Sequence, residues 1–136
     1  MSLFGPLLDG SGRLAEDLRA QLAAEGVLFL AEELPGSVAM HERANGRPAR
    51  AQFGGTSGAI AVTRRRLLVW SDGRAQIDLP VRDGRLRAIE IAADRSDRVL
   101  FAFELERLHP DRRGRMEIRL RTAQAEQVVA LAHAAR

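Results

Sequence analysis

The sequence predicts a mainly β domain: a bent antiparallel sheet of about seven strands, preceded by one helix and closed by another. Two observations support this. Apolar and polar residues alternate along much of the chain between residues 27 and 121, and a period of two is typical of half-buried strands. Three turn dipeptides divide the alternating segments: Asn45 and Gly46, Asp72 and Gly73, Asp83 and Gly84. The chain should therefore run through successive hairpins.

Length and composition indicate one folded unit. The chain has 136 residues, of which 46% are hydrophobic and 29% charged, as in ordinary globular proteins with a sizeable core. We expect a single domain over residues 1–136, with a helical segment at 1–26 and the β domain with its closing helix at 27–136.

The charge balance is a weak sign of a polyanion partner. The sequence pI is about 11.0, yet the formal net charge is only +3. All 21 basic residues are arginine, and lysine and tyrosine are absent. Because nothing titrates between histidine and arginine, a small positive excess raises the pI into the arginine range.

Several classes of segment and site are not expected. Without cysteine there is no disulfide, thiolate metal site or cysteine nucleophile. The first twelve residues lack a basic start, and Gly5 and Pro6 interrupt their apolar run, so they do not resemble a signal peptide. No apolar run is long enough to span a membrane. These features predict a cytoplasmic protein.

The first predicted element is a helix capped by Asp9 or Ser11 and ended by Gly26. Its apolar stripe recurs every fourth residue, at Leu14, Leu18 and Leu22. Since the stripe is narrow, we expect the helix to dock only one edge on the domain.

Strand-like periodicity begins at Val27. Pro35 and Gly36 then mark either a tight turn or a bend within one long strand, and we favour the bend. Pro48 and the glycine-rich residues 54–58 predict an irregular or loosely paired segment. Residues 59–70 predict two apolar strands around a charged tip, which should face water because Arg64, Arg65 and Arg66 cannot be buried unpaired.

The later segments show which face is buried. Residues 75–81 place Ala75, Ile77, Leu79 and Val81 on one side, and residues 86–92 predict another strand. We expect a joint core of Phe101, Phe103, Met116, Ile118, Leu120 and Val128. Thr122 can cap a final helix over residues 122–135, whose apolar face contains Ala125, Val128, Val129, Ala132 and Ala135.

This order of elements resembles the pleckstrin-homology-like (PH-like) fold, in particular bacterial PH-type and GRAM-type domains. Those families have a Thr-x-x-Arg-Leu hairpin, which residues 63–67 match, then a short strand of the type at residues 77–80, and a helix that plugs the barrel. The resemblance covers residues 27–136. The chain departs from it in its N-terminal helix and in Arg64, where the hairpin often carries asparagine. The resemblance implies a non-catalytic binding or scaffolding module.

No catalytic, cofactor or metal site is predicted. The absence of lysine excludes a Walker A loop and Schiff-base chemistry. Residues 10–15 match the dinucleotide fingerprint formally, but no βαβ unit surrounds them. His41 and Glu42 begin like a zinc-protease helix, yet Asn45 replaces the second histidine, so a surface pair on a strand is the simpler interpretation.

Two arginine groups remain as candidates for anion binding: Arg43, Arg47 and Arg50 near the first turn, and Arg64, Arg65 and Arg66 at the charged tip. Solvated surface charge is the plainer interpretation of both. PH domains bind phosphoinositide head groups near the loop after their first strand, so the resemblance favours the first group, although it implies no lipid specificity.

The partner is therefore expected to be a protein or an anionic ligand such as a lipid head group. The alternative is a nucleic-acid-binding protein that uses surface arginines. Against it, only 4% of the residues are aromatic, and Phe101 and Phe103 fall on the apolar face instead of offering a surface for stacking bases.

Overall fold

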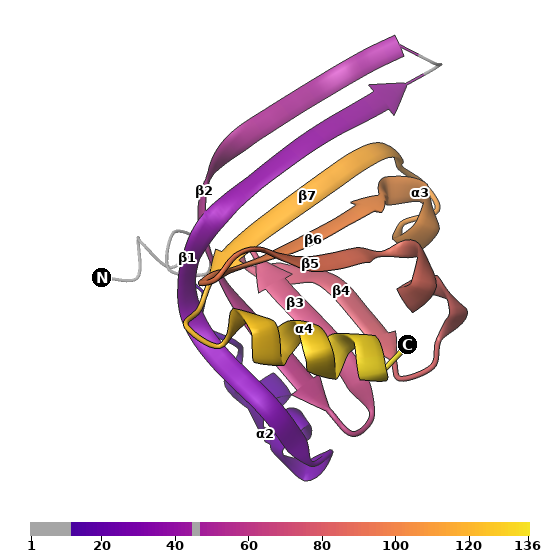
Figure 1. Cartoon of the computed structure of the whole chain (residues 1–136). Coiled ribbons are helices and arrows are strands. Elements are labelled where there is room, and N and C mark those ends of the chain that lie inside the picture. Colours follow the sequence, from indigo (N-terminus) through magenta and orange to yellow (C-terminus); the bar gives the residue numbers. More distant parts are fainter. Residues whose placement is uncertain (1–11, 45–46) are drawn as a thin grey trace.

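The computed structural model describes residues 12–44 and 47–136, with backbone alone at residues 44 and 47–52. Seven antiparallel strands form one curled sheet, a half-barrel, in the order β4-β3-β2-β1-β7-β6-β5 (Figure 1). The strands are β1 (Val27–Ala44), β2 (Arg47–Thr63), β3 (Arg66–Ser71), β4 (Arg74–Pro80), β5 (Glu90–Arg95), β6 (Arg98–Glu104) and β7 (Arg113–Arg121). The helices are α2 (Glu16–Ala24), α3 (Leu105–Leu108), α4 (Ala125–Ala134) and the 3₁₀ helix η2 (Gly84–Ala88). The mainly β prediction is confirmed.

β1 is one long strand that bends, as predicted. It pairs with β2 along its length and with β7 from Gly36 to Arg43. The ladder with β2 shifts register between Ala31 and Leu34, where Glu33 has a φ of 56°. A Cβ at Gly36 would overlap the carbonyl oxygen of Arg119, so the close approach of β1 and β7 requires glycine there.

The expectation of an irregular segment is confirmed at Pro48 and wrong for the glycine-rich residues. β2 is one strand, but its ladder with β1 shifts register between Pro48 and Arg50, whereas residues 54–58 pair with β1 in regular register. The glycines do not loosen the sheet, because backbone hydrogen bonds form the ladder whatever the side chain. At Gly58 a Cβ would overlap the carbonyl oxygen of Trp70 and would lie 2.9 Å from the Leu120 side chain. This glycine therefore permits tight packing against β3 and the core.

The N-terminal helix begins later than predicted. Its N-cap is Ala15, which has no capping side chain, so Leu14 precedes the helix although it is 4% exposed. The Leu14 N–H donates a hydrogen bond to Glu32 at 2.8 Å. The expected caps, Asp9 and Ser11, lie outside the described residues. Gly26, with a φ of 85°, follows the helix as predicted.

The stretch around β4 and η2 also differs from the expected pattern. A register shift beside Trp70 turns Ala75 toward the face opposite Ile77, whereas the sequence predicted one shared face. Gln76 is buried, and its side-chain amide donates a hydrogen bond to the Ser71 carbonyl at 3.1 Å. Residues 84–88 form η2, capped by Asp83, and strand β5 starts only at Glu90. The apolar positions of residues 86–92 fit a helical turn as well as a strand, so periodicity alone does not separate the two.

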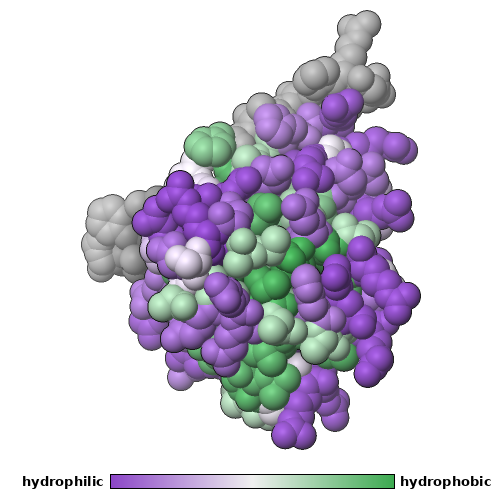
Figure 2. Space-filling view, in the orientation of Figure 1, coloured by the Kyte–Doolittle hydropathy of each residue, from purple (hydrophilic) through white to green (hydrophobic). Residues whose placement is uncertain are grey.

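The concave face of the sheet holds the main core. It unites Phe101, Phe103, Met116, Ile118, Leu120 and Val128, as predicted, with α4 packed across the opening. α4 is shorter than the predicted helix, because the Thr122 hydroxyl accepts the Gln124 N–H in a turn before it. Figure 2 shows apolar residues over the middle of this side and hydrophilic residues around its margin.

A smaller apolar cluster lies on the convex face of β2 and β3. It contains Leu14, Leu22, Ala59, Ala61 and Leu68, all at most 4% exposed. Leu22 comes from α2, which docks one edge on the sheet as the sequence predicted.

Candidate functional site

The structure describes only part of the predicted arginine group near the first turn. Asn45 and Gly46 lie outside the described residues, and so do the side chains of Arg47 and Arg50. The backbone register places Arg47 opposite Ala44 and Arg50 opposite Glu42. Arg43 is described and is exposed. The expected convergence of the three arginines stays a prediction.

The β1–β7 ladder brings Arg43 to residues distant in sequence. Arg43 lies directly opposite Arg113, and His41 lies directly opposite Arg115. Residues two apart in a strand share a face, so these four side chains form a square on the convex face. They border a hollow of about 670 Å³, which is also lined by Glu104, Glu106 and Gly114. We call it the outer hollow.

The cations of the outer hollow differ in what neutralises them. Arg115 contacts Glu117, Glu90 and Glu104 at 3.2, 3.5 and 3.7 Å. Within the described part of the chain, neither Arg43 nor Arg113 makes a hydrogen bond or ion pair, and both are exposed. Two like charges directly opposite each other on a ladder repel. The pair is thus a cationic position without an ion pair, which the carboxylate of Glu106 offsets only on the Arg113 side.

The carboxylates at the margin are already engaged. Backbone N–H groups of Glu106 itself and of Gly114 donate to Glu106, and they hold the pKa of that carboxyl below its ordinary value. Glu106 therefore stays ionised at neutral pH and limits the positive field on that side. Glu104 lies 3.7 Å from Arg115.

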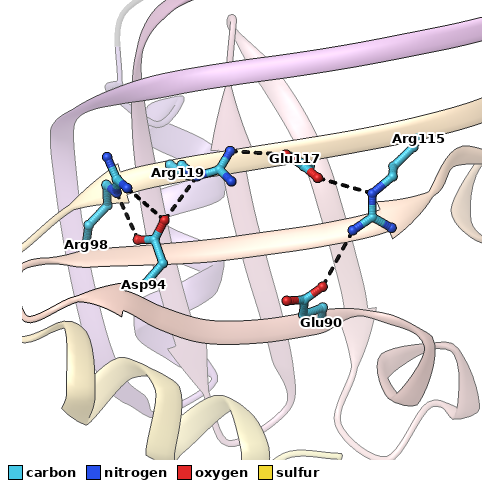
Figure 3. A network of polar contacts seen from close by, with 6 residues as sticks. All are labelled: Glu90, Asp94, Arg98, Arg115, Glu117 and Arg119. Atoms are coloured by element: carbon cyan, nitrogen blue, oxygen red, sulfur yellow. Dashed lines mark hydrogen bonds and ion pairs between the residues drawn. The ribbon is translucent and has the colours of Figure 1, made fainter.

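Over β5–β7 the convex face carries a network of paired charges that we call the charge ladder: Glu90, Asp94, Arg98, Arg115, Glu117 and Arg119 (Figure 3). Asp94 accepts hydrogen bonds from Arg98 at 2.8 Å and from Arg119 at 3.0 Å. Glu117 bridges Arg115 and Arg119, each at 3.2 Å. Hydrogen bonds from Arg98 hold the pKa of Asp94 below its ordinary value against the opposing effect of burial, and Arg119 adds to the decrease. Each arginine of the charge ladder thus has a carboxylate partner, whereas Arg121 on the same face of β7 is exposed and has no hydrogen bond or ion pair with a described residue.

The charged tip between β2 and β3 borders a second hollow, of about 980 Å³. Arg64 and Arg65 are exposed there as predicted. Arg66 is not: its side chain is 16% exposed and lies 2.8 Å from Glu25 and 3.1 Å from Asp78. The expectation that all three arginines face water is wrong for Arg66, because two carboxylates compensate its partial burial.

The Thr-x-x-Arg pattern has a structural explanation at this tip. The Thr63 hydroxyl accepts the N–H groups of Arg65 and Arg66 at 3.1 and 3.0 Å and donates to Glu25 at 2.9 Å. Partial burial raises the pKa of Glu25, but hydrogen bonds from Arg66 and Thr63 outweigh it, so the pKa lies below its ordinary value. The motif therefore ties the hairpin to the end of α2.

The other sequence candidates do not assemble into a centre. His41 is exposed, while Glu42 contacts Arg112 at 3.0 Å. Over residues 12–44 and 47–136, no three histidine, aspartate or glutamate side chains are placed to hold a metal ion. Residues 10 and 11 of the fingerprint lie outside the described residues, and residues 13–15 precede α2. None of the described helices is long and apolar enough to cross a membrane.

Comparison with known proteins adds no identification, since neither a protein-family model nor a curated protein sequence matches the chain. Sequence reasoning also missed Arg113 and His41 as partners of Arg43. The alternation of residues 114–121 indicates which face Arg115 occupies, but no local signal predicts that β7 pairs with β1.

Proposed function

We propose that the chain is a non-catalytic, PH-like binding module of the cytoplasm that holds an anionic ligand in the outer hollow. Arg43 and Arg113 are the main contacts, and His41 is a third. The observation that carries the proposal is the direct opposition of two exposed arginines that make no hydrogen bond or ion pair with a described residue, although Glu106 attracts Arg113 from the margin. The curled sheet and the helix α4 across its opening support the PH-like part.

An anion between Arg43 and Arg113 removes the repulsion of this pair. Directly opposite residues of an antiparallel ladder have Cα atoms roughly 4.5–5.5 Å apart. Two guanidinium groups at that spacing can each offer a planar fork of donors to one phosphate or carboxylate.

The margin favours a compact ligand with more than one negative charge. Glu104 and Glu106 lie on one side of the outer hollow, and the charge ladder on β5–β7 continues from it with carboxylates interspersed. A long polyanion lying along this face would meet these carboxylates. A phosphate group held at one point would not.

The test is a titration of the chain with inorganic phosphate, inositol trisphosphate, phosphatidylserine vesicles and a single-stranded oligonucleotide at near-physiological salt. Arg43→Ala and Arg113→Ala should each weaken saturable phosphate binding by about tenfold or more, as expected for losing a charge-assisted hydrogen bond. The matched control is Arg87→Ala, an exposed arginine on η2, which should leave the affinity unchanged.

Three outcomes would contradict the proposal. No binding by the parent chain removes the anion function. Loss only in Arg64→Ala or Arg65→Ala moves the site to the charged tip. Oligonucleotide binding that grows with chain length and depends on all of these arginines alike favours the nucleic-acid alternative.

A further inference from the structure

The outer edge of β2 is open over much of its length. The β2–β3 ladder begins at Gly58, whereas β2 itself starts at Arg47. Between Arg47 and Ser57 this strand pairs with β1 on one side, and no strand among the described residues pairs with its other side. Figure 1 shows this part of β2 as the outermost strand at the upper edge of the sheet. The N–H and C=O groups on this side have no strand partner among the described residues, and such groups can pair with another strand.

The described part of this edge lacks the usual protection. Natural edge strands are commonly blocked by charged residues, by proline or by a bulge. Residues 53–57 contain none of these charges and no proline, and their register with β1 is regular. Phe53 is 81% exposed, which is unusual for a large apolar side chain. The edge is thus open to strand addition up to Thr56, since Gly12 donates a hydrogen bond to the Ser57 hydroxyl at 3.1 Å and lies against the end of this stretch.

A hollow of about 320 Å³ lies beside the edge on the concave face. Gly54 is the cross-strand partner of Val38, so the two positions share a face. On this concave face the hollow is lined by two apolar side chains, Val38 and Met40, which are 8% and 5% exposed. A Cβ built at Gly54 meets no atom within 4 Å. An apolar side chain from an added strand therefore has space over Gly54.

We call this hollow the edge hollow. Its charges favour an acidic residue in the added strand, close to the apolar residue over Gly54. Its lining contains Arg74, Arg112 and Asp72, which is one more positive charge than negative. Arg112 is held by Glu42 at 3.0 Å, and Asp72 accepts the Thr56 hydroxyl at 3.1 Å. Arg74 is exposed and has no hydrogen bond or ion pair with a described residue. In an added strand, residues two positions from the apolar one point to the same side.

We propose that the free edge of β2 binds an extended segment of another protein with the pattern acidic-x-apolar-x-acidic. The segment adds a strand beside residues 53–57, places its apolar side chain over Gly54 and directs a carboxylate to Arg74. Backbone pairing supplies affinity and the edge hollow supplies selectivity, as in other cases of strand addition. A second copy of this chain fits less well, because two β2 edges paired about a two-fold axis would present Gly54 and Thr56, with neither an apolar nor an acidic group for the hollow.

The probe is a synthetic nine-residue threonine peptide with leucine at its centre and glutamate two positions to either side, titrated by calorimetry against the full chain. Gly54→Leu should weaken binding by about tenfold or more, because the new side chain would occupy the hollow, where an added Cβ has no atom within 4 Å. The control is Gly84→Leu on η2, where an added Cβ also meets nothing within 4 Å, and it should bind like the parent chain.

A charge reversal tests the acidic position. Arg74→Glu should exchange the preference of the chain, so that a peptide with lysine in place of both glutamates binds more tightly than the original. Arg87→Glu makes the same change of net charge on η2 and should keep the original preference. Hydrogen exchange should slow at β2 amides between residues 53 and 57 when the peptide is bound.

The proposal is overturned if the parent chain does not bind the peptide, or if Gly54→Leu and Arg74→Glu behave like their controls. It is equally overturned if slowed exchange maps to β5, the other edge of the sheet. A concentration-dependent dimer that Gly54→Leu dissociates, without peptide binding, would assign the edge to a second copy of the chain.

Discussion

The convex face of the sheet is built in two contrasting ways. Over β2 and β3 it is apolar, with Ala59, Ala61 and Leu68 covered by Leu14 and by Leu22 of α2. Over β5–β7 the same face has no covering helix among the described residues and carries the charge ladder of Figure 3. The difference follows from the outward residues of each strand: small apolar side chains need a cover, whereas paired charges remain stable in water. α2 therefore completes the fold over β2 and β3, whereas the charged half needs no cover.

The largest loss of stability among these tests of the convex face should follow a substitution in the half that α2 covers. Leu22 is 0% exposed, so Leu22→Ala should lower the free energy of unfolding by roughly 2–5 kcal/mol. Phe103→Ala in the concave core, expected at roughly 3–5 kcal/mol, sets the scale in the same urea denaturation. Leu28→Ala is the matched control because Leu28 is 46% exposed. A cost below about 1 kcal/mol for Leu22→Ala would mean that α2 is not part of the cooperative unit.

The next effect concerns the ion pair that joins the end of α2 to the charged tip. Glu25→Gln should cost about 1–2 kcal/mol at neutral pH, since the side chains of Glu25 and Arg66 are 18% and 16% exposed and hydrogen bonds to charged groups exceed neutral ones. Because the pKa of Glu25 is lowered in the folded chain, its contribution is present above the unfolded value, about 4.3, and is lost as the pH falls through the folded value.

Urea denaturation at a series of pH values checks this sign. The parent chain should lose stability on acidification, and the loss should be smaller in Glu25→Gln. A Thr63→Val variant, which removes one hydrogen bond to Glu25, should lie between the two. If Glu25→Gln follows the parent curve at every pH, the ion pair does not hold α2 in place.

A smaller effect is expected in the uncovered half. Arg119→Ala breaks contacts to Asp94 and Glu117 at 3.0 and 3.2 Å, but all these groups are reached by solvent. The cost should be at most about 1 kcal/mol and should shrink as salt is added. A double-mutant cycle of Arg119→Ala with Glu117→Ala measures the coupling. A cost equal to that of Leu22→Ala would erase the contrast between the two halves.

The smallest effect on stability is expected for Arg98→Ala, which should nevertheless shift the pKa of Asp94 clearly. NMR titration of Asp94 should give a pKa below the ordinary aspartate value of about 3.9, because Arg98 and Arg119 donate to the ionised carboxylate. Arg98→Ala should move this pKa upward, whereas Arg87→Ala should leave it unchanged. A carboxyl that titrates normally in the parent chain would show that the charge ladder is not formed in solution.

The local sequence pattern was sufficient to predict those features that residues close together in the chain determine, such as the buried face of a strand or the type of a turn. The alternation of β6 and β7 correctly assigns Phe101 and Ile118 to the core. Asp72 and Gly73 both have positive φ, as the predicted type I′ turn requires. These features depend on side-chain period and on backbone sterics, which a short segment already specifies.

Long-range pairing decided the rest. β2 is regular over its glycine-rich residues 54–58 because β1 pairs with them, and Arg66 is partly buried because Glu25 and Asp78 come from other elements. In the same way, the opposition of Arg43 and Arg113 and the open edge of β2 arise where strands meet or part. The sequence by itself determined the mainly β class, the inward faces and several turns. Only the tertiary structure decided which charges are neutralised and which backbone edge stays open, because both depend on partners distant along the chain.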